Sequence, residues 1–587
     1  MAEKLDKVDV VIVGTGWSGS IPAAELSKKG YKVVALERGK DQDVSDFVGA
    51  KDELRYASRY YMQEENSLNT ITARSSTDEK AFPLRTIEEN NEGTDVGGNS
   101  SHWSGVTHRA TAFDFEARSK TIENYGEDKI PDEMFLQDWG ITYDELEEYY
   151  DQFEKMAGTS GEEDPVGVWR SSDYPTPPMK ETPPITLFKE AAKNLGYHPF
   201  QIPSGNISEQ YENPDGQTIN ACQYCSFCML YGCDFGAKSD PLVTTIPTAK
   251  ETNNFELRTD SYARRVTHEG GKATGIMYTD MKTGLEYEQP ADVVVLGGYP
   301  LSNTKLMLLS EIGEPYDPET KKGVIGKNAG GFSSPNATAT GFFEDKKFNL
   351  AMGAGALGGT FSDLDSDNLD TSDHDFIGGG MVELRLRGEG PVTYTHVPQD
   401  TPGWGKEFKE KSLHYANRTL KVVYKSASYG WSFNYMDLDP TYKDIFGDPL
   451  LRVTNRIPEH DVKMTEFGKE KMQELMEEMG ADIVETGGSA QYAGDSPEDQ
   501  WDHTQGFGEA GGGVIMGDDP EISAVNNYSQ VWDMENLFVI GASALPQKIQ
   551  QQTATIGAFA YRASEGIDEY LNGDGGLLVD PKEKENA

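Results

Sequence analysis

The sequence has few basic residues and no long apolar run. Its 587 residues contain 53 Lys and Arg against 98 Asp and Glu, which gives a formal net charge of −45. Because a surface of that charge repels nucleic acid and anionic membranes, we expect neither as a direct partner. The sequence also lacks a stretch of about 18 uninterrupted apolar residues, so it predicts no direct membrane span.

The first residues lack the features of a secretory signal peptide. MAEKLDK has no apolar segment and leads directly into VDVVIV, a predicted strand. We therefore expect a soluble chain that is cytoplasmic, or that is exported or held at a membrane through a partner subunit. High salt screens the self-repulsion of so acidic a surface, since the Debye length falls to about 3 Å at 1 M. The acidic composition therefore fits a halophilic host, with an ordinary acidic bacterial enzyme as the alternative.

Cysteine is scarce, and all of it lies in one place. The chain has 4 cysteines within twelve consecutive residues, namely Cys222, Cys225, Cys228 and Cys233. A C-x2-C-x2-C-x4-C run allows one loop to wrap a single inorganic centre with several thiolates. Zinc ribbons usually separate two C-x2-C knuckles by a long insert, whereas consecutive two-residue gaps are typical of iron–sulfur ligation. The run favours an iron–sulfur cluster, with zinc, disulfides or inert thiols as the alternatives.

Glycine is abundant, and one glycine turn carries a nucleotide-binding motif. The apolar run 8–13 predicts a buried parallel strand, and the turn that follows contains Gly14, Gly16 and Gly19. A helical pattern and a second strand come next, and that strand closes at Glu37. In such a βαβ opening the glycines let the main chain approach a pyrophosphate, and the acid accepts hydrogen bonds from ribose hydroxyls. We therefore expect this opening to bind a dinucleotide.

Later segments repeat the buried-strand pattern. Residues 291–310 predict a strand, a glycine turn and a helix, and residues 536–541 predict another buried strand before a helix from Thr553. Between them, residues 331–500 are richer in alternating patterns, which indicate an antiparallel sheet. The sequence thus predicts an α/β fold with a discontinuous Rossmann-like domain and a substrate domain that has a mostly antiparallel sheet.

Several segments carry motifs of a known family. They are the nucleotide opening, VGGNSSHWSG (96–105), LGGYPLSNTKLMLLS (296–310) and ENLFVIGASALP (535–546). Together these segments resemble the glucose–methanol–choline (GMC) flavin oxidoreductases, in the family's order and over most of the chain. The Cys run, which continues as DFGAKSDPLVTTIP, is similar to the branch of gluconate 2-dehydrogenase flavoprotein subunits.

The resemblance implies a redox enzyme with partners. It implies FAD, an iron–sulfur cluster and electron delivery to a haem- or quinone-linked subunit rather than to oxygen, with a small accessory subunit. The cluster would be a three-iron one, although four thiolates also permit four irons. The substrate would be a small polar alcohol or sugar. The predicted domains are an FAD-binding domain of residues 1–115, 216–330 and 505–575, a substrate domain of residues 116–215 and 331–504, and an acidic tail of residues 576–587.

The resemblance also implies which residues bind the cofactor, because their positions in this sequence match the family's motifs. Ser101-His102-Trp103 fits a pattern in which relatives join a histidine covalently to the flavin. His102 is therefore either the site of a covalent link or a histidine packed beside non-covalent FAD. The ADP half would be held by Gly14, Gly16, Gly19 and Glu37, the flavin or pyrophosphate would be approached by Gly97, Gly98, Asn99 and Ser100, and the isoalloxazine or ribityl chain would lie near Gly541 and Ala542.

The catalytic positions depart from the family pattern. Where the family has a histidine base and a second His or Asn, this sequence has Glu509 and Gln551. Glu509 would be the base if burial beside the flavin raises its pKa, with Gln551 holding the substrate. Alternatively, His503 takes the role of base, or the rebuilt site serves a different substrate class or acts as a reductase. A carboxylate near the flavin would disfavour an acidic substrate, so a neutral sugar or polyol is expected.

Overall fold

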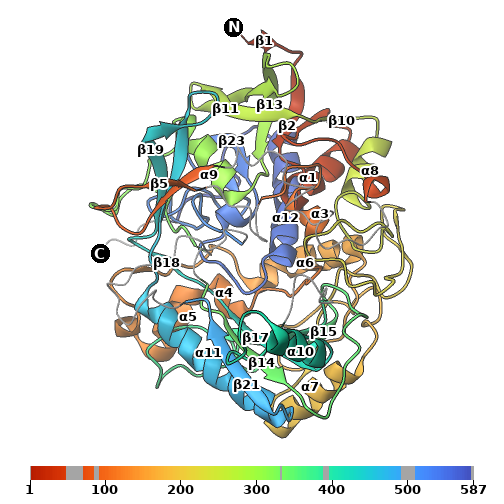
Figure 1. Ribbon diagram of the computed structural model, residues 1–587. Helices are drawn as coiled ribbons and strands as arrows, with labels where there is room; N and C mark the ends of the chain where they lie inside the picture. The colour runs from red at the N-terminus through yellow and green to blue at the C-terminus, as the bar shows by residue number, and fades with distance from the viewer. Residues whose placement is uncertain are drawn as a thin grey trace.

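The computed structural model describes residues 2–47, 70–84, 92–330, 334–387, 396–490 and 509–582. Figure 1 shows two bodies. A sheet around β2 (Val8–Val13) and β13 (Glu286–Leu296) fills the upper half, and a second sheet around β14 (Ala337–Phe342) and β17 (Thr419–Ser426) lies below it. Within the described ranges, no helix is long and apolar enough to cross a membrane.

The upper body is built on a parallel sheet. Its strands run in the order β10 (Phe255–Arg258), β3 (Val33–Leu36), β2, β13 and β23 (Met534–Val539), and each neighbouring pair is parallel. The central strands are runs of Val, Ile and Leu that are buried on both faces, as parallel strands covered by helices require. Because these strands come from the start, middle and end of the chain, the predicted discontinuous α/β fold is confirmed.

Helices from distant parts of the chain cover this sheet. α1 (Trp17–Lys28) packs against α8 (Thr245–Glu251) and α12 (Thr553–Asn572), and α12 also packs against α6 (Tyr143–Ala157). Gly557 permits that approach, because a Cβ there would lie 2.1 Å from the ring of Phe153. α6 lies in the predicted substrate segment 116–215, yet its buried face belongs to the core of the parallel sheet. The predicted domain boundary therefore separates α6 from the core against which it packs.

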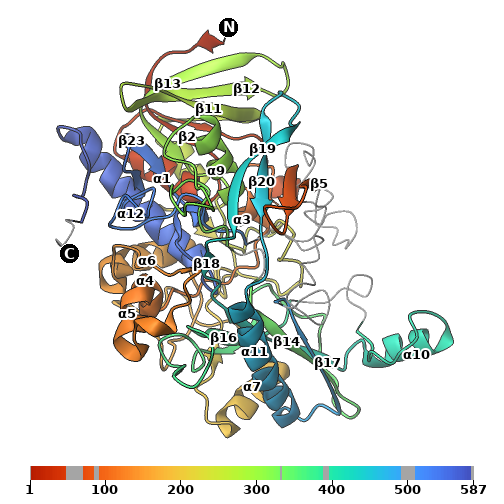
Figure 2. The same cartoon turned by 90° about the vertical axis from the view of Figure 1, so that its left-hand side faces the viewer.

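The lower body is built on an antiparallel sheet. Its order is β21 (Ile483–Gly488), β14, β17, β16 (Gly380–Arg385), β15 (Gly358–Phe361) and β7 (Phe200–Gln201), and every pair is antiparallel. α11 (Glu459–Glu478) packs on β14, β17 and β21, and α7 (Pro183–Asn194) packs on β15. Figure 2 shows both helices below the parallel sheet. The predicted antiparallel sheet is therefore confirmed.

Smaller elements complete the chain. β19 (Tyr435–Lys443), β20 (Pro449–Thr454), β4 (Ile71–Arg74) and β5 (Phe82–Leu84) form a third sheet, and α10 (Lys406–Tyr415) projects from the lower body in Figure 2. Within the described residues, the other α-helices and strands are β1 (Glu3–Lys4), α3 (Asn99–His102), α4 (Ala112–Phe115), α5 (Ala117–Tyr125), β6 (Met134–Phe135), β8 (Tyr211–Glu212), β9 (Thr218–Ile219), β11 (Ser261–Glu269), β12 (Lys272–Asp280), α9 (Pro300–Leu309), β18 (Gly430–Trp431) and β22 (Gln530–Val531). Three short 3-10 helices in the same ranges are η1 (Val44–Asp46), η2 (Glu127–Lys129) and η3 (Ala542–Ala544).

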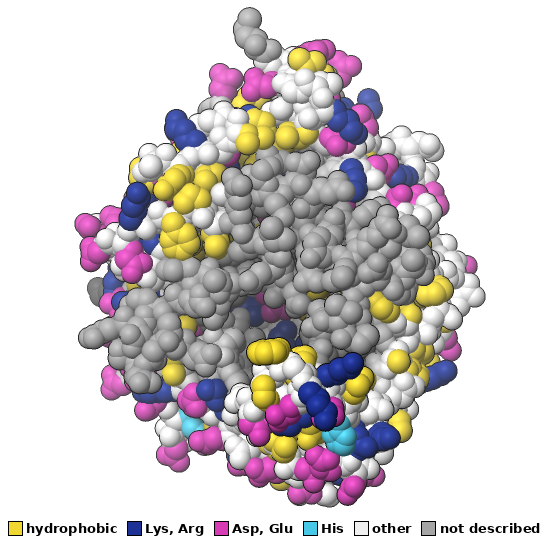
Figure 3. Space-filling view, in the orientation of Figure 1, with side chains coloured by type: hydrophobic (Ala, Val, Ile, Leu, Met, Phe, Trp, Pro, Cys, Tyr) yellow, Lys and Arg dark blue, Asp and Glu magenta, His cyan; other side chains and the backbone are white. Residues whose placement is uncertain are grey.

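The acidic surface is spread rather than concentrated. In Figure 3 the Asp and Glu side chains are scattered around the rim of the visible face, with Lys and Arg between them. Many of the lysines and arginines form ion pairs with these acids, for example Lys4 with Glu288 and Arg118 with Glu127, both at 2.8 Å or less. Such exposed pairs each contribute little to stability, so the net negative charge remains the dominant surface property.

Candidate active site

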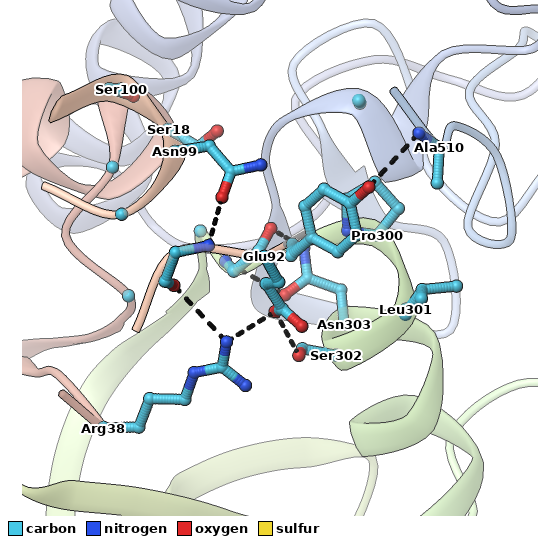
Figure 4. Close-up of a pocket in the computed structure, with 18 of the residues that line it drawn as sticks. Ser18, Arg38, Glu92, Asn99, Ser100, Pro300, Leu301, Ser302, Asn303 and Ala510 are labelled. Atoms are coloured by element: carbon cyan, nitrogen blue, oxygen red, sulfur yellow. Dashed lines mark hydrogen bonds and ion pairs between the residues drawn. The ribbon is translucent and has the colours of Figure 1, made fainter. Parts of the chain in front are cut away.

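A cavity of about 380 Å³ runs from the nucleotide motif to the predicted catalytic position. It opens where the loops after β2 and β13 meet, at the carboxyl ends of the parallel strands, which is where open α/β sheets bind ligands. Figure 4 shows part of its wall. The predicted residues that line it are Gly14, Gly16, Glu37, Gly98, Asn99, Ser100, His102, Ala542, Glu509 and Gln551.

At the nucleotide end of the cavity, segments of main chain lie so close together that only glycine fits between them. Gly14 has a φ of +89°, and a Cβ on Gly19 would lie 2.0 Å from the carbonyl oxygen of Gly14, so neither position accepts a side chain. The buried Glu37 accepts hydrogen bonds from the Thr15 N–H, at 3.1 Å, and the Thr15 hydroxyl, at 2.6 Å. Burial raises the pKa of Glu37. Gly19 shapes the turn from behind the wall of the cavity.

A second loop, residues 97–104, forms the middle of the cavity and is called the His102 loop below. Gly97 and Gly98 have φ values of +91° and +49°, and α3 begins directly after them. His102 is buried, and its Nε2 has no hydrogen-bond partner within the described ranges. Burial, together with the nearby charge of Lys238, lowers the pKa of His102 to about 4. The ring is therefore neutral at physiological pH.

Arg38 and Glu92 form a further part of the wall that the sequence motifs did not indicate. Their ion pair spans 3.2 Å, and Glu92 also accepts from the Ser302 hydroxyl at 2.8 Å. Figure 4 shows these side chains crossing the cavity near Asn99. The contact joins the end of β3 to α9, two elements that the sequence places about 260 residues apart.

The loop that carries the four cysteines, residues 222–233, is called the cysteine loop below. It packs against the His102 loop. Met229 and Leu230 line the cavity directly after Cys228, and the Leu230 N–H donates to the His102 carbonyl at 2.7 Å. Tyr224, Ser226 and Leu230 all have positive φ values, between 53° and 73°. Three non-glycine residues in the left-handed region within one loop store strain, which is typical of functional segments.

In the described part of the chain, the four thiols do not form a site for a single metal ion. All four cysteines are free, and in the described chain no group of three or more His, Cys, Asp or Glu side chains could hold a metal ion. Burial raises the pKa of Cys222 to about 11 and of Cys228 to about 12. The donor chemistry does fit iron–sulfur ligation, because the main-chain N–H groups of Tyr224 and Ala237 already donate to Cys222 and Cys233 sulfurs at 3.4 Å.

At the other end of the cavity, Glu509 lies beside two lysines. Its carboxylate contacts Lys548 at 2.8 Å and Lys425 at 3.3 Å, while its side chain is 48% exposed. Partial burial pushes the pKa of Glu509 upward, but the charges of these lysines outweigh it and hold the pKa well below its usual range. The expectation that burial raises this pKa is therefore wrong. Glu509 is ionised at any physiological pH.

Gln551 binds the same group of cations. With its amide oxygen facing the donors, it accepts from Arg385 at 2.6 Å and from Lys425 at 2.9 Å. Arg385 also pairs with Glu383, which is fully buried and lies 3.4 Å from His108. Burial opposes ionisation of Glu383, yet the Arg385 charge lowers its pKa to about 2.

Cations outnumber acids among the groups that contact one another at this end. Arg385, Lys425 and Lys548, called the cation cluster below, contact the two carboxylates of Glu383 and Glu509. The buried Asp461 is a further acid near Lys548, and burial raises its pKa. The cation cluster reverses the electrostatic expectation from Glu509 alone. His503, the alternative base, lies outside the described residues.

Comparisons with known proteins identify the family. A family model described as GMC oxidoreductase matches residues 432–560. The gluconate 2-dehydrogenase flavoprotein of Pantoea cypripedii is 37% identical over 98% of this chain and 96% of its own length. The chain belongs to the GMC oxidoreductases. The fructose dehydrogenase large subunit of Gluconobacter japonicus is 23% identical, over 97% of this chain and 99% of that protein.

The fold agrees with that of solved GMC-like structures. The formate oxidase of Aspergillus oryzae RIB40 superimposes with a TM-score of 0.59, at 14% identity, over 96% of this chain and 98% of that one. As a GMC oxidoreductase, the chain is an enzyme related to dehydrogenases that act on CH–OH groups, and the family implies FAD. The residues around the cavity fit that cofactor. The glycines let the main chain approach a pyrophosphate closely, and His102 lines the cavity with a buried Nε2 that has no hydrogen-bond partner among the described residues.

Lys425 should make the stability of this GMC oxidoreductase depend on pH. Burial lowers its pKa from 10.5 to about 8. Between these values the unfolded chain holds a proton that native Lys425 has lost, so stability rises with pH, by at most about 1.4 kcal/mol per unit. We expect Lys425→Met to reduce the rise in melting temperature between about pH 8 and pH 9.5. Lys409→Met, on the exposed face of α10, should keep the wild-type rise, and equal pH dependence in both variants would contradict the shift.

Proposed function

We propose that this GMC oxidoreductase is an FAD-dependent dehydrogenase that oxidises a CH–OH group of a sugar acid and passes the electrons to a partner subunit. The cation cluster carries the proposal, because Arg385 lines the cavity beside Glu509 and Gln551, and Lys425 and Lys548 contact Glu509. A guanidinium and ammonium groups recognise a carboxylate through charge-assisted hydrogen bonds, which are stronger than neutral ones. The relative named for gluconate supports the same substrate class.

FAD would lie along the cavity, with its adenosine near Glu37 and its flavin near His102, Ala542 and Gln551. When bound, FAD accepts a hydride from the carbon that bears the hydroxyl. The protein's part is to bind and orient the substrate. The amide oxygen of Gln551 accepts hydrogen bonds from Arg385 and Lys425. Its NH2 group would then donate to the substrate oxygen.

The proton of the substrate hydroxyl needs an acceptor at the same end of the cavity. Glu509 lines the cavity as a carboxylate and is available to accept it. Its two lysine partners keep it ionised and so able to accept a proton, but the same charges lower its pKa and make it a weak base. We propose Glu509 for this role, with His503 as the alternative base.

The loop of residues 222–233 is the proposed route by which electrons leave. We propose that Cys222, Cys225, Cys228 and Cys233 supply the ligands of an iron–sulfur cluster, which transfers single electrons. The loop's contact with the cavity through Met229 and Leu230 supports this placement. A relative that is a large subunit supports a partner subunit as the acceptor.

Anaerobic reduction of the flavin tests the substrate class. D-gluconate should bleach the oxidised-flavin absorbance, and the neutral polyol D-glucitol should do so far less effectively. Arg385→Met should weaken gluconate binding about 10- to 150-fold, which corresponds to the loss of a charged hydrogen bond. Arg385→Lys keeps the charge and should retain part of the affinity, while Arg118→Met, on the exposed surface, should change nothing.

Two outcomes would contradict this proposal. Equal bleaching by gluconate and glucitol would show that the cation cluster does not select a carboxylate. No bleaching by either compound, in an enzyme whose flavin dithionite still reduces, would favour a rebuilt site with a different reaction. If the purified protein contains zinc but neither iron nor sulfide, the proposed iron–sulfur cluster at residues 222–233 is contradicted.

His102 gives a separate prediction about the cofactor. Its neutral ring lines the cavity and its Nε2 has no hydrogen-bond partner among the described residues, so we expect FAD to be attached covalently through this residue. After acid precipitation the yellow colour should remain with the protein pellet. His102→Ala should release it to the supernatant, whereas His198→Ala, at an exposed histidine, should not. A yellow supernatant from the unaltered enzyme would show that the flavin is not covalent.

A further inference from the structure

One buried lysine connects the loop of residues 222–233 to the His102 loop. Lys238 is 1% exposed, and its ammonium group donates to three main-chain carbonyls. Two of them belong to the cysteine loop, Cys228 at 2.8 Å and Tyr231 at 2.7 Å. The third is the carbonyl of Trp103 in the His102 loop, at 3.0 Å. An ammonium has three N–H donors, so these bonds match its full capacity.

Neighbouring bonds reinforce the same junction. The Leu230 N–H donates to the His102 carbonyl at 2.7 Å, and the indole N–H of Trp103 donates to the Ser239 carbonyl at 2.8 Å. The cysteine loop, the His102 loop and the segment of Lys238 are therefore joined at three places. Because Met229 and Leu230 line the cavity, this junction is also the wall between the cavity and the cysteines.

The charge of Lys238 acts on both sides of that wall. On the cavity side, it adds to burial in lowering the pKa of His102. On the cysteine side, the ammonium group lies 2.8 Å from the carbonyl oxygen of Cys228. A cation in a buried position interacts strongly with nearby negative charge, because little water screens it. Negative charge gained on either side of the wall is therefore stabilised by one residue.

We propose that Lys238 is a positioning residue that couples two redox sites, by fixing the cysteine loop against the His102 loop and by stabilising the electrons that each site accepts. The inference rests on the proposed function, which places a flavin on one side of Lys238 and a cluster on the other. A glutamine could bond some of these carbonyls but would lack the charge. An arginine would keep the charge, but its planar fork cannot donate to the same three carbonyls.

Two variants of Lys238 separate geometry from charge. Lys238→Met keeps the apolar stem and removes both the charge and the hydrogen bonds. In the purified holoenzyme we expect the affinity of the cysteine loop for iron to fall about tenfold or more, as for residues that support metal ligands. The midpoint potential of the flavin should also move to a more negative value. Lys238→Arg should lose iron as well, but its flavin potential should stay close to that of the unaltered enzyme.

Lys327→Met is the matched control. Lys327 is a buried lysine that lies over Phe135 and donates to the Ile522 carbonyl at 3.2 Å. Its loss should leave the iron content per flavin and the flavin potential unchanged, which separates the effect of Lys238 from the general effect of removing a buried lysine. Iron and sulfide assays with redox potentiometry measure both quantities without reference to turnover.

Unaltered iron content and flavin potential in Lys238→Met would overturn the proposed role of Lys238. If Lys238→Met does not fold, Lys238→Arg carries the test, and wild-type iron content in that variant would overturn the positioning role. An unaltered enzyme that contains flavin but no iron would instead contradict the proposed electron route. In that case the shift in flavin potential still tests the charge of Lys238 separately.

Discussion

The close approach of two main-chain turns is the constraint on which the rest of the molecule depends. A Cβ on Gly14 would lie 3.0 Å from the carbonyl oxygen of Gly297, and one on Gly297 would lie 2.8 Å from the Cα of Gly19. The turns after β2 and β13 can therefore meet only as glycines. Their contact places the start of α1 and the end of β13 at one edge of the parallel sheet, and the cavity opens at that edge. Everything that lines the cavity is positioned relative to this junction.

The sequence predicts the parts of the site that are local in the chain. The turn with Gly14, the acid Glu37 and the position of His102 follow from motifs whose residues are neighbours in sequence, because each motif supplies its own geometry. The strands and the discontinuous sheet are predictable for a similar reason. Buried parallel strands appear as short runs of Val, Ile and Leu wherever they occur in the chain.

The cation cluster could not be found in this way. Arg385 and Lys425 lie on adjacent strands of the antiparallel sheet, and Lys548 lies in the loop before α12, so only the folded chain brings them to Glu509. Read by itself, Glu509 is a carboxylate whose pKa burial would raise, and that reading gave the wrong direction for its pKa. The error arose because the sign of a pKa shift depends on partners that sequence spacing does not reveal.

The two ends of the proposed reaction handle charge in the same way, although different residues are involved. At the substrate end, buried cations hold Glu509 ionised and leave positive charge for an anion. At the electron exit, a buried cation lies between the cavity and the cysteines. In a chain with a net charge of −45, buried lysines in these two places are not a by-product of composition. Keeping a charged lysine out of water costs free energy unless its donors are satisfied and it serves nearby negative charge. The donors of Lys238 are satisfied by three carbonyls, and Lys425 and Lys548 face the carboxylate of Glu509. Met229 and Leu230 at one site and Glu509 at the other line the same cavity. Under the proposed function, this interior would receive an anion at one end and stabilise transferred electrons at the other.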